Sequence, residues 1–123
     1  MKFDVNNKPK GLRRLVLANE NSLKAFRWLY KNEAAFRQEL LLLLLLTPIT
    51  FLFDITRLEQ VTLIISLLFI LFTEIINTAI EAVVDRIGLE IHPLSGLAKD
   101  LGSAAVFISL VIASLTWLAI LVF

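Results

Sequence analysis

The sequence contains no cysteine, one histidine and four glycines. Without cysteine, disulfide bonds and thiolate metal sites are excluded, and a lone histidine, His92, excludes a multi-histidine metal site within one chain. The motifs G-x-x-x-x-G-K-[ST] and G-x-G-x-x-G are also missing, so side chains and a metal ion would have to hold any nucleotide. The net charge is only +1, which gives no indication of a nucleic-acid partner.

Apolar residues are abundant instead, at 58% of the chain, which exceeds the usual share in a soluble domain. Residues 103–123 include no charged residue and are long enough to span a bilayer. The apolar run 40–53 is shorter than the roughly 20 residues that a span needs, so the first span is expected to begin earlier. We predict three transmembrane helices, at 34–53, 57–87 and 97–123.

The segment 9–31 differs from these spans. Apolar residues recur in it at helical spacing, and arginines and lysines fill the remaining face. This pattern is typical of a basic amphipathic helix that lies on an anionic membrane surface. The predicted fold is therefore an all-α membrane protein, a single membrane domain over residues 1–123, with three transmembrane helices and an N-terminal surface helix.

Basic residues are unevenly distributed, because nine of the twelve lysines and arginines precede Leu40. The positive-inside rule then places the N-terminus and the loop between the last two spans in the cytoplasm. Acidic side chains at the ends of the spans would gather on this face, where nucleotide is available.

The span 57–87 is expected to begin at a capping box, Thr56 with Glu59, and to end at Gly88. As a helix it would be about 46 Å long, against about 30 Å of hydrocarbon, so it either tilts or projects its end into the interface. That end has four polar residues spaced by three or four positions, which places them on one face of the helix. They are Glu74, Asn77, Glu81 and Asp85.

Acids on a membrane helix must face protein, water or a metal ion. Glu74 follows a mostly apolar stretch directly, which favours a functional role over a solvated face. Asp85 could instead be solvated, or pair with Arg86 or Lys99. Glu33 could meet Glu81 across two helices or two subunits to hold Mg²⁺, or could be an ordinary acid at a helix N-terminus.

Lys99 and Asp100 precede the last apolar run. Lys99 could hold phosphates as a point charge, or could be an interfacial lysine that extends its ammonium towards water. His92 with Pro93 is interpreted first as part of a loop.

Three segments resemble the bacterial integral-membrane diacylglycerol kinase family, and the resemblance covers nearly the whole chain from Arg14 onward. They are Asn32-Glu-Ala-Ala-Phe-Arg-Gln-Glu39, Glu74-Ile-Ile-Asn-Thr-Ala-Ile-Glu-Ala-Val-Val-Asp-Arg-Ile-Gly88 and Ala98-Lys-Asp-Leu-Gly-Ser-Ala-Ala105. The resemblance implies a homotrimer in the bacterial inner membrane, with active sites shared between neighbouring subunits. It also implies transfer of the γ-phosphate of Mg-ATP to diacylglycerol, which gives phosphatidic acid.

The resemblance further implies roles for individual residues. Glu74 matches the general base and Asn77 an active-site amide, while Glu33 and Glu81 match carboxylates that bind the metal and the nucleotide. The implied ATP contacts are Glu33, Glu81, Glu90, His92, Lys99 and Asp100. The positions implied to lie near the lipid substrate are Arg14, Gln38, Glu39, Glu74 and Ser103.

Three alternatives remain open at this point. A kinase of the same architecture could act on a polyprenol such as undecaprenol, which His92-Pro93-Leu94 slightly favours. An ion-translocating ring subunit would carry a single carboxylate at mid-membrane, which differs from several acids at one end. A non-catalytic anchor subunit would keep its function when Glu74 is replaced by glutamine.

Overall fold

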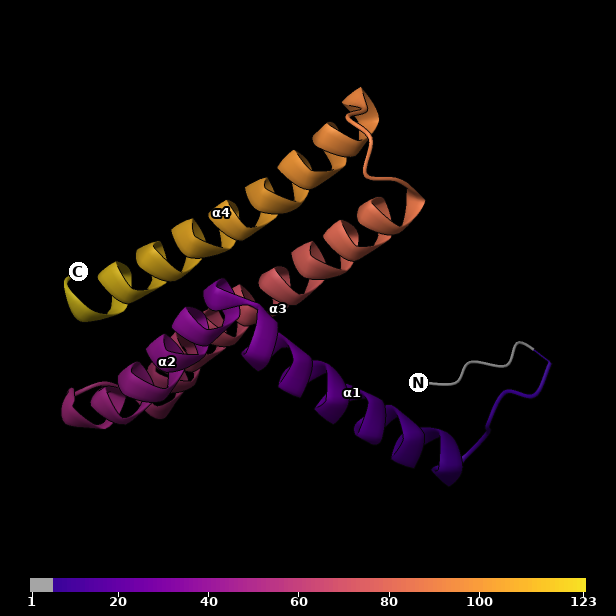
Figure 1. Cartoon of the computed structure of the whole chain (residues 1–123). Coiled ribbons are helices and arrows are strands. Elements are labelled where there is room, and N and C mark those ends of the chain that lie inside the picture. Colours follow the sequence, from indigo (N-terminus) through magenta and orange to yellow (C-terminus); the bar gives the residue numbers. More distant parts are fainter. Residues whose placement is uncertain (1–5) are drawn as a thin grey trace. The chain divides into compact units, whose positions relative to one another are not determined.

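The computed structural model describes residues 6–123, which form four α-helices and one short 3₁₀ helix (Figure 1). Three helical stretches in this range are long and apolar enough to cross a membrane: Ala34–Leu52, Arg57–Ile87 and Pro93–Leu121. The chain is thus an all-helical, multi-pass membrane protein, as the sequence predicts. In chain order the elements are α1 (Leu12–Asn32), α2 (Ala34–Ile49), η1 (Thr50–Leu52), α3 (Arg57–Ile87) and α4 (Pro93–Leu121).

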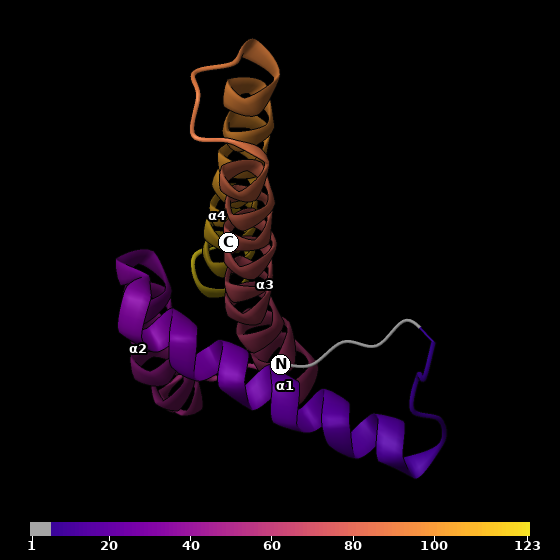
Figure 2. The same ribbon diagram turned by 45° about the vertical axis from the view of Figure 1, so that its right-hand side comes forward.

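The chain divides into two compact units with the boundary between Arg37 and Gln38, inside α2. In the first unit α1 is one unbroken helix (Figure 2). It ends at Glu33, whose backbone is extended and whose N–H donates to the Leu29 carbonyl at 2.8 Å. The Glu33 carbonyl in turn accepts from the Arg37 N–H at 3.2 Å. Glu33 is therefore the one residue that separates α1 from α2.

In the second unit α3 and α4 run antiparallel and side by side over most of their length (Figures 1 and 2). Their core centres on Leu67, Ile70 and Ala113. Burial of such side chains, together with close packing, is what holds helices together inside a bilayer. The partly buried side chains of Leu43, Leu46 and Trp117 pack against this core.

Two side-chain hydrogen bonds link α3 to α4 within this packed region. Trp117 Nε1–H donates to Ser66 Oγ at 3.1 Å, and Ser66 donates to the Leu63 carbonyl at 2.6 Å. Thr73 donates to Ser109 Oγ at 2.9 Å, and Ser109 donates to a backbone carbonyl of its own helix. In both cases the serine hydroxyl that accepts a hydrogen bond also donates one to a backbone carbonyl, so its hydrogen-bonding capacity is satisfied although it is buried.

The ends of α3 follow the sequence signals. The Thr56 side chain accepts from the Glu59 N–H at 3.1 Å, and Glu59 accepts from the Thr56 N–H at 3.0 Å. This capping box satisfies two of the backbone donors that a helix start leaves free. Gly88 is the C-cap, as predicted.

Helix α4 begins at Pro93, four residues before the predicted membrane span of residues 97–123. His92 Nδ1 accepts from the Leu94 N–H at 3.0 Å and so caps the helix. Pro93 occupies the first turn, where its missing N–H costs nothing. The interpretation of His92 with Pro93 as part of a loop therefore needs correction, because His92 is the N-cap of α4 and Pro93 is its first residue.

Candidate active site

The polar face of α3 is formed by Glu74, Asn77, Glu81 and Asp85, which are three or four residues apart. Glu74 and Asn77 are buried, with 7% and 8% of their surface exposed, Glu81 is half-buried, and Asp85 is exposed. Four polar groups thus follow one another from the packed interior to the end of the helix. Along the axis this sequence covers about 16 Å.

Asn77 lies at the centre of this face. Its Nδ2–H donates to Glu81 Oε1 at 3.5 Å. Its Oδ1 is buried and has no hydrogen-bond partner among residues 6–123. A buried carbonyl oxygen without a partner is costly, so this orientation of the amide needs an explanation from its surroundings.

Glu39, on α2, belongs to the same unit as Glu74, and the two carboxylates are close enough for their charges to interact. Glu39 is half-buried, and its Oε2 has no hydrogen-bond partner within the described part of the chain. Two neighbouring carboxylates in a poorly solvated setting destabilise each other. The pair therefore offers carboxylate oxygens that can accept a hydrogen bond from a hydroxyl group.

The loop end of the helix pair, where residues 88–92 join α3 to α4, contains an ion pair. Lys99 Nζ lies 2.8 Å from Asp85 Oδ1, and the side chains remain 44% and 49% exposed. Asp85 therefore pairs with Lys99, one of the two partners considered from the sequence. A pair this open to water is weakly held, so Lys99 can exchange Asp85 for another anion.

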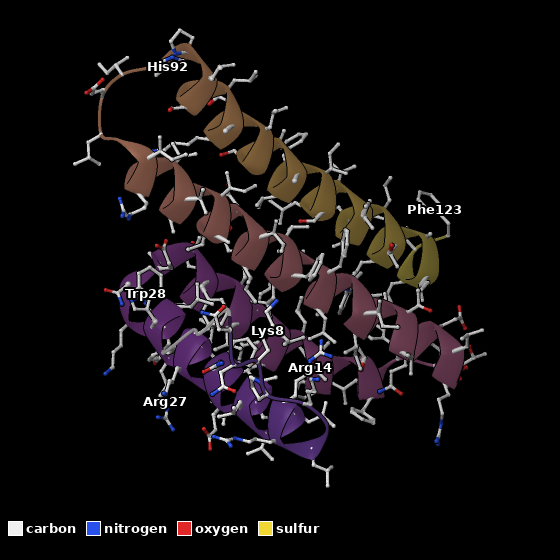
Figure 3. The ribbon with its side chains drawn as sticks, turned by 90° about the vertical axis from the view of Figure 1, so that its right-hand side faces the viewer. Lys8, Arg14, Arg27, Trp28, His92 and Phe123 are labelled. Carbon is white, nitrogen blue, oxygen red and sulfur yellow. The ribbon has the colours of Figure 1, made fainter. Side chains whose placement is uncertain are left out.

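A hollow of about 280 Å³ opens beside this ion pair. Three of the six residues expected to contact ATP line it, namely Glu90, His92 and Lys99. Figure 3 shows His92 at this end of the helix pair and Phe123 at the other. The remaining lining residues are Val84, Asp85, Gly88, Leu89, Ile91, Ser95 and Gly96.

His92 has a structural role that the sequence did not indicate. Because Nδ1 accepts the Leu94 N–H, the neutral imidazole presents its other nitrogen, Nε2, as a donor. His92 is exposed, so that donor is free to meet a ligand at the hollow. The cap and a nucleotide contact are compatible.

The other expected site residues are spread over the chain. Glu33 and Arg14 belong to the first unit, and Arg14 is exposed on α1 (Figure 3). Since Glu81 belongs to the second unit, the pairing of Glu33 with Glu81 stays a prediction. Gln38 on α2, and Asp100 and Ser103 on α4, are exposed.

Within residues 6–123 no three carboxylate or imidazole groups gather closely enough to hold a metal ion by themselves. Mg²⁺ is commonly held by one or two carboxylates while water and phosphate oxygens supply the other ligands. The half-buried Glu81 carboxylate is a hard oxygen donor of the preferred kind. The donor chemistry on α3 therefore fits a magnesium ion that is shared with a substrate.

Sequence reasoning missed the residue that faces Asn77. Gly102 is buried on α4, and a Cβ added there would overlap Asn77 Oδ1. Small residues permit close helix contacts, and among those of α3 and α4 Ser109 is buried between the two helices. By contrast, four alanines of the same helices are exposed within the chain, namely Ala79, Ala82, Ala104 and Ala105. Composition alone does not say which small residue lies on the packed side.

Comparison with known proteins gives a consistent result. Residues 20–121 match the family described as prokaryotic diacylglycerol kinase. The chain is 48% identical to a diacylglycerol kinase of Pseudomonas aeruginosa, with 90% of each chain covered. It is 47% identical to that of Escherichia coli K12, with 94% of each covered, and 46% identical to that of Haemophilus influenzae, with 94% and 98% covered. The chain therefore belongs to the prokaryotic diacylglycerol kinase family and is a kinase.

Proposed function

We propose that this chain transfers the γ-phosphate of Mg-ATP to the free hydroxyl of diacylglycerol and so produces phosphatidic acid. The observation that carries the proposal is the gradient of burial along the polar face of α3. Glu74, at its buried end, is suited to an acceptor that resides in the membrane. Asp85 and Lys99, at its exposed end, are suited to a donor that arrives from water.

Glu74 is the proposed general base. A primary alcohol must lose its proton as its oxygen attacks the phosphorus, and a positioned carboxylate can accept that proton. The acyl chains need no pocket of their own because the bilayer solvates them. The lipid headgroup would then meet the buried Glu74 and the half-buried Glu39.

Glu81 and Glu33 are the proposed metal-binding carboxylates, and Lys99 is the proposed phosphate contact. When bound, Mg²⁺ would neutralise phosphate charge and help to align the transferred group. The ammonium of Lys99 would leave Asp85 for a phosphate oxygen. Because the Asp85–Lys99 pair is exposed to water, breaking it costs little free energy. Glu90, His92 and Asp100 would border the nucleotide at the same end.

The proposed assembly is a homotrimer in the bacterial inner membrane, with the N-terminus in the cytoplasm. Bringing Glu33 of one subunit to Glu81 of another would complete the metal site. The exposed alanines of α3 and α4 would permit close contact between subunits. Along α1, large apolar side chains are exposed and suit a membrane surface; they are Leu12, Leu15, Val16, Leu23, Phe26, Trp28 and Tyr30.

A phosphorylation assay tests the proposed function. Purified protein in bilayers receives labelled ATP with either diacylglycerol or undecaprenol, with and without Mg²⁺. The proposal expects Mg²⁺-dependent labelling of diacylglycerol at a much higher kcat/KM than that of undecaprenol. Strong preference for undecaprenol, or labelling that survives complete chelation of divalent ions, would overturn it. His92-Pro93, which slightly favoured a polyprenol, has an independent explanation as the cap and first turn of α4.

A further inference from the structure

We propose that Gly102 is a positioning residue for the phosphoryl-transfer site, because its missing side chain fixes the direction of the Asn77 amide. The inference deepens the proposed function and rests on it. Gly102 is buried on α4 at the level of Asn77 on α3. It has no side-chain functional group, and the atoms nearest to the position of its missing Cβ all belong to Asn77, so its effect is expected to act through that residue.

The space beside Gly102 is already occupied. A Cβ at this position would overlap Asn77 Oδ1 and would lie 3.2 Å from Asn77 Cγ. Its distance to the Asn77 backbone, 3.7 Å to Cα, is an ordinary contact. An added Cβ would therefore clash with the end of the Asn77 side chain, whereas the distance between the two helix backbones would not have to change.

The direction of the amide follows from this contact. With Oδ1 placed against Gly102, Nδ2 is directed along α3 to Glu81 Oε1 at 3.5 Å. The buried Oδ1 lacks a conventional partner among the described residues, and a glycine Cα–H is a weak donor that commonly meets carbonyl oxygens between helices. If the amide reversed, its carbonyl oxygen would face the Glu81 carboxylate and repel it. The glycine thus keeps an N–H pointed at the proposed metal-binding carboxylate.

The backbone conformation of Gly102 does not require glycine, since it lies inside α4 and has no positive φ. Alanine even has the higher helix propensity. A glycine in a helix interior is therefore explained here by space, and that space is used by Asn77.

A double-mutant cycle tests the inference with Gly102→Ala, Asn77→Ala and the double variant. Gly102→Ala is expected to lower kcat for lipid phosphorylation about tenfold or more, with KM for the lipid little changed. In the Asn77→Ala background, which removes Oδ1 and Cγ, the same substitution should lower neither kcat nor the melting temperature. Contacting residues commonly show non-additivity of this size.

A second readout follows Asn77 itself. The Nδ2 signals of the labelled Asn77 side chain should shift in Gly102→Ala and shift far less in Ser109→Ala, a control on the same helix interface whose hydroxyl bonds to Thr73. Unchanged Nδ2 signals, or effects of Gly102→Ala that are fully additive with Asn77→Ala, would overturn the inference. Because wild-type turnover is measured alongside, loss of the proposed function itself would appear as an inactive wild type.

Discussion

The α3–α4 pair has two halves that differ in how their polar groups are satisfied: the loop half, next to residues 88–92, and the far half, at the other end. In the far half, apolar side chains such as Leu67 and Ile70 form the core. Trp117 donates to Ser66 there, and Ser66 donates to a backbone carbonyl. In the loop half, Asn77 Oδ1 is buried without a partner among residues 6–123, and the Asp85–Lys99 pair lies half in water. Yet the same two helices form both halves.

We interpret the far half as the part that stabilises the helix pair and the loop half as the part that carries the chemistry. In the far half, local helix preferences and tertiary packing favour the same structure, which is typical of a region that only has to fold. Buried polar groups without hydrogen-bond partners are expected where function requires groups that remain available to a ligand. Substitutions in the two halves should therefore affect different measurements, and the following predictions test that division.

The largest effect is expected for Glu74→Gln in the loop half. Glutamine keeps the size of the buried side chain but cannot accept the alcohol proton, so turnover should fall about 10²- to 10⁴-fold. The melting temperature in detergent should change little. Retained turnover would remove Glu74 from the role of base and would favour a non-catalytic chain.

An intermediate effect is expected for Lys99→Met, which removes the ammonium and keeps much of the aliphatic length. The KM for ATP should rise about 10- to 100-fold, as expected for loss of a charge-assisted hydrogen bond, while the KM for the lipid stays the same. Asp85→Asn is the matched control, because it breaks the same exposed pair and leaves the lysine in place. If both variants raise the KM for ATP equally, the intact pair matters and not the free lysine.

The smallest effect is expected in the far half, for Trp117→Phe. Phenylalanine keeps most of the packing but cannot donate to Ser66 Oγ. A side-chain hydrogen bond between membrane helices contributes about 0.6 kcal/mol on average, so unfolding should become slightly easier. Turnover and both KM values should be unchanged. A drop in turnover that exceeds the loss of folded protein would show that the two halves are coupled.

The sequence predicts most of the helical architecture, for physical reasons that can be named. Long apolar runs identify the three membrane-spanning helices, and Thr56 with Glu59 marks the start of α3 because its capping box depends on neighbouring residues alone. The helical turn before the predicted span 97–123 was not identified from the sequence, since a cap made by His92 follows no common capping pattern.

The candidate site was less accessible from sequence. Helical spacing places Glu74, Asn77 and Glu81 on one face of α3, and the structure agrees. The partners contributed by other helices could not be derived in this way, because periodicity describes one helix at a time. The neighbours of Asn77 and Glu74, namely Gly102 and Glu39, could be identified only from the three-dimensional structure.

The length of α3 and α4 has a consequence for the choice of membrane. The two helices measure about 46 Å and 44 Å, roughly 15 Å more than a typical hydrocarbon layer. That surplus equals about the stretch between Glu74 and Asp85. Lipids with longer acyl chains would immerse this stretch and draw Glu81 away from water, whereas shorter chains would hydrate Glu74. We therefore expect acyl-chain length in the host bilayer to change the hydration of Glu74 and Glu81, and turnover measured across bilayers of increasing thickness should pass through a maximum.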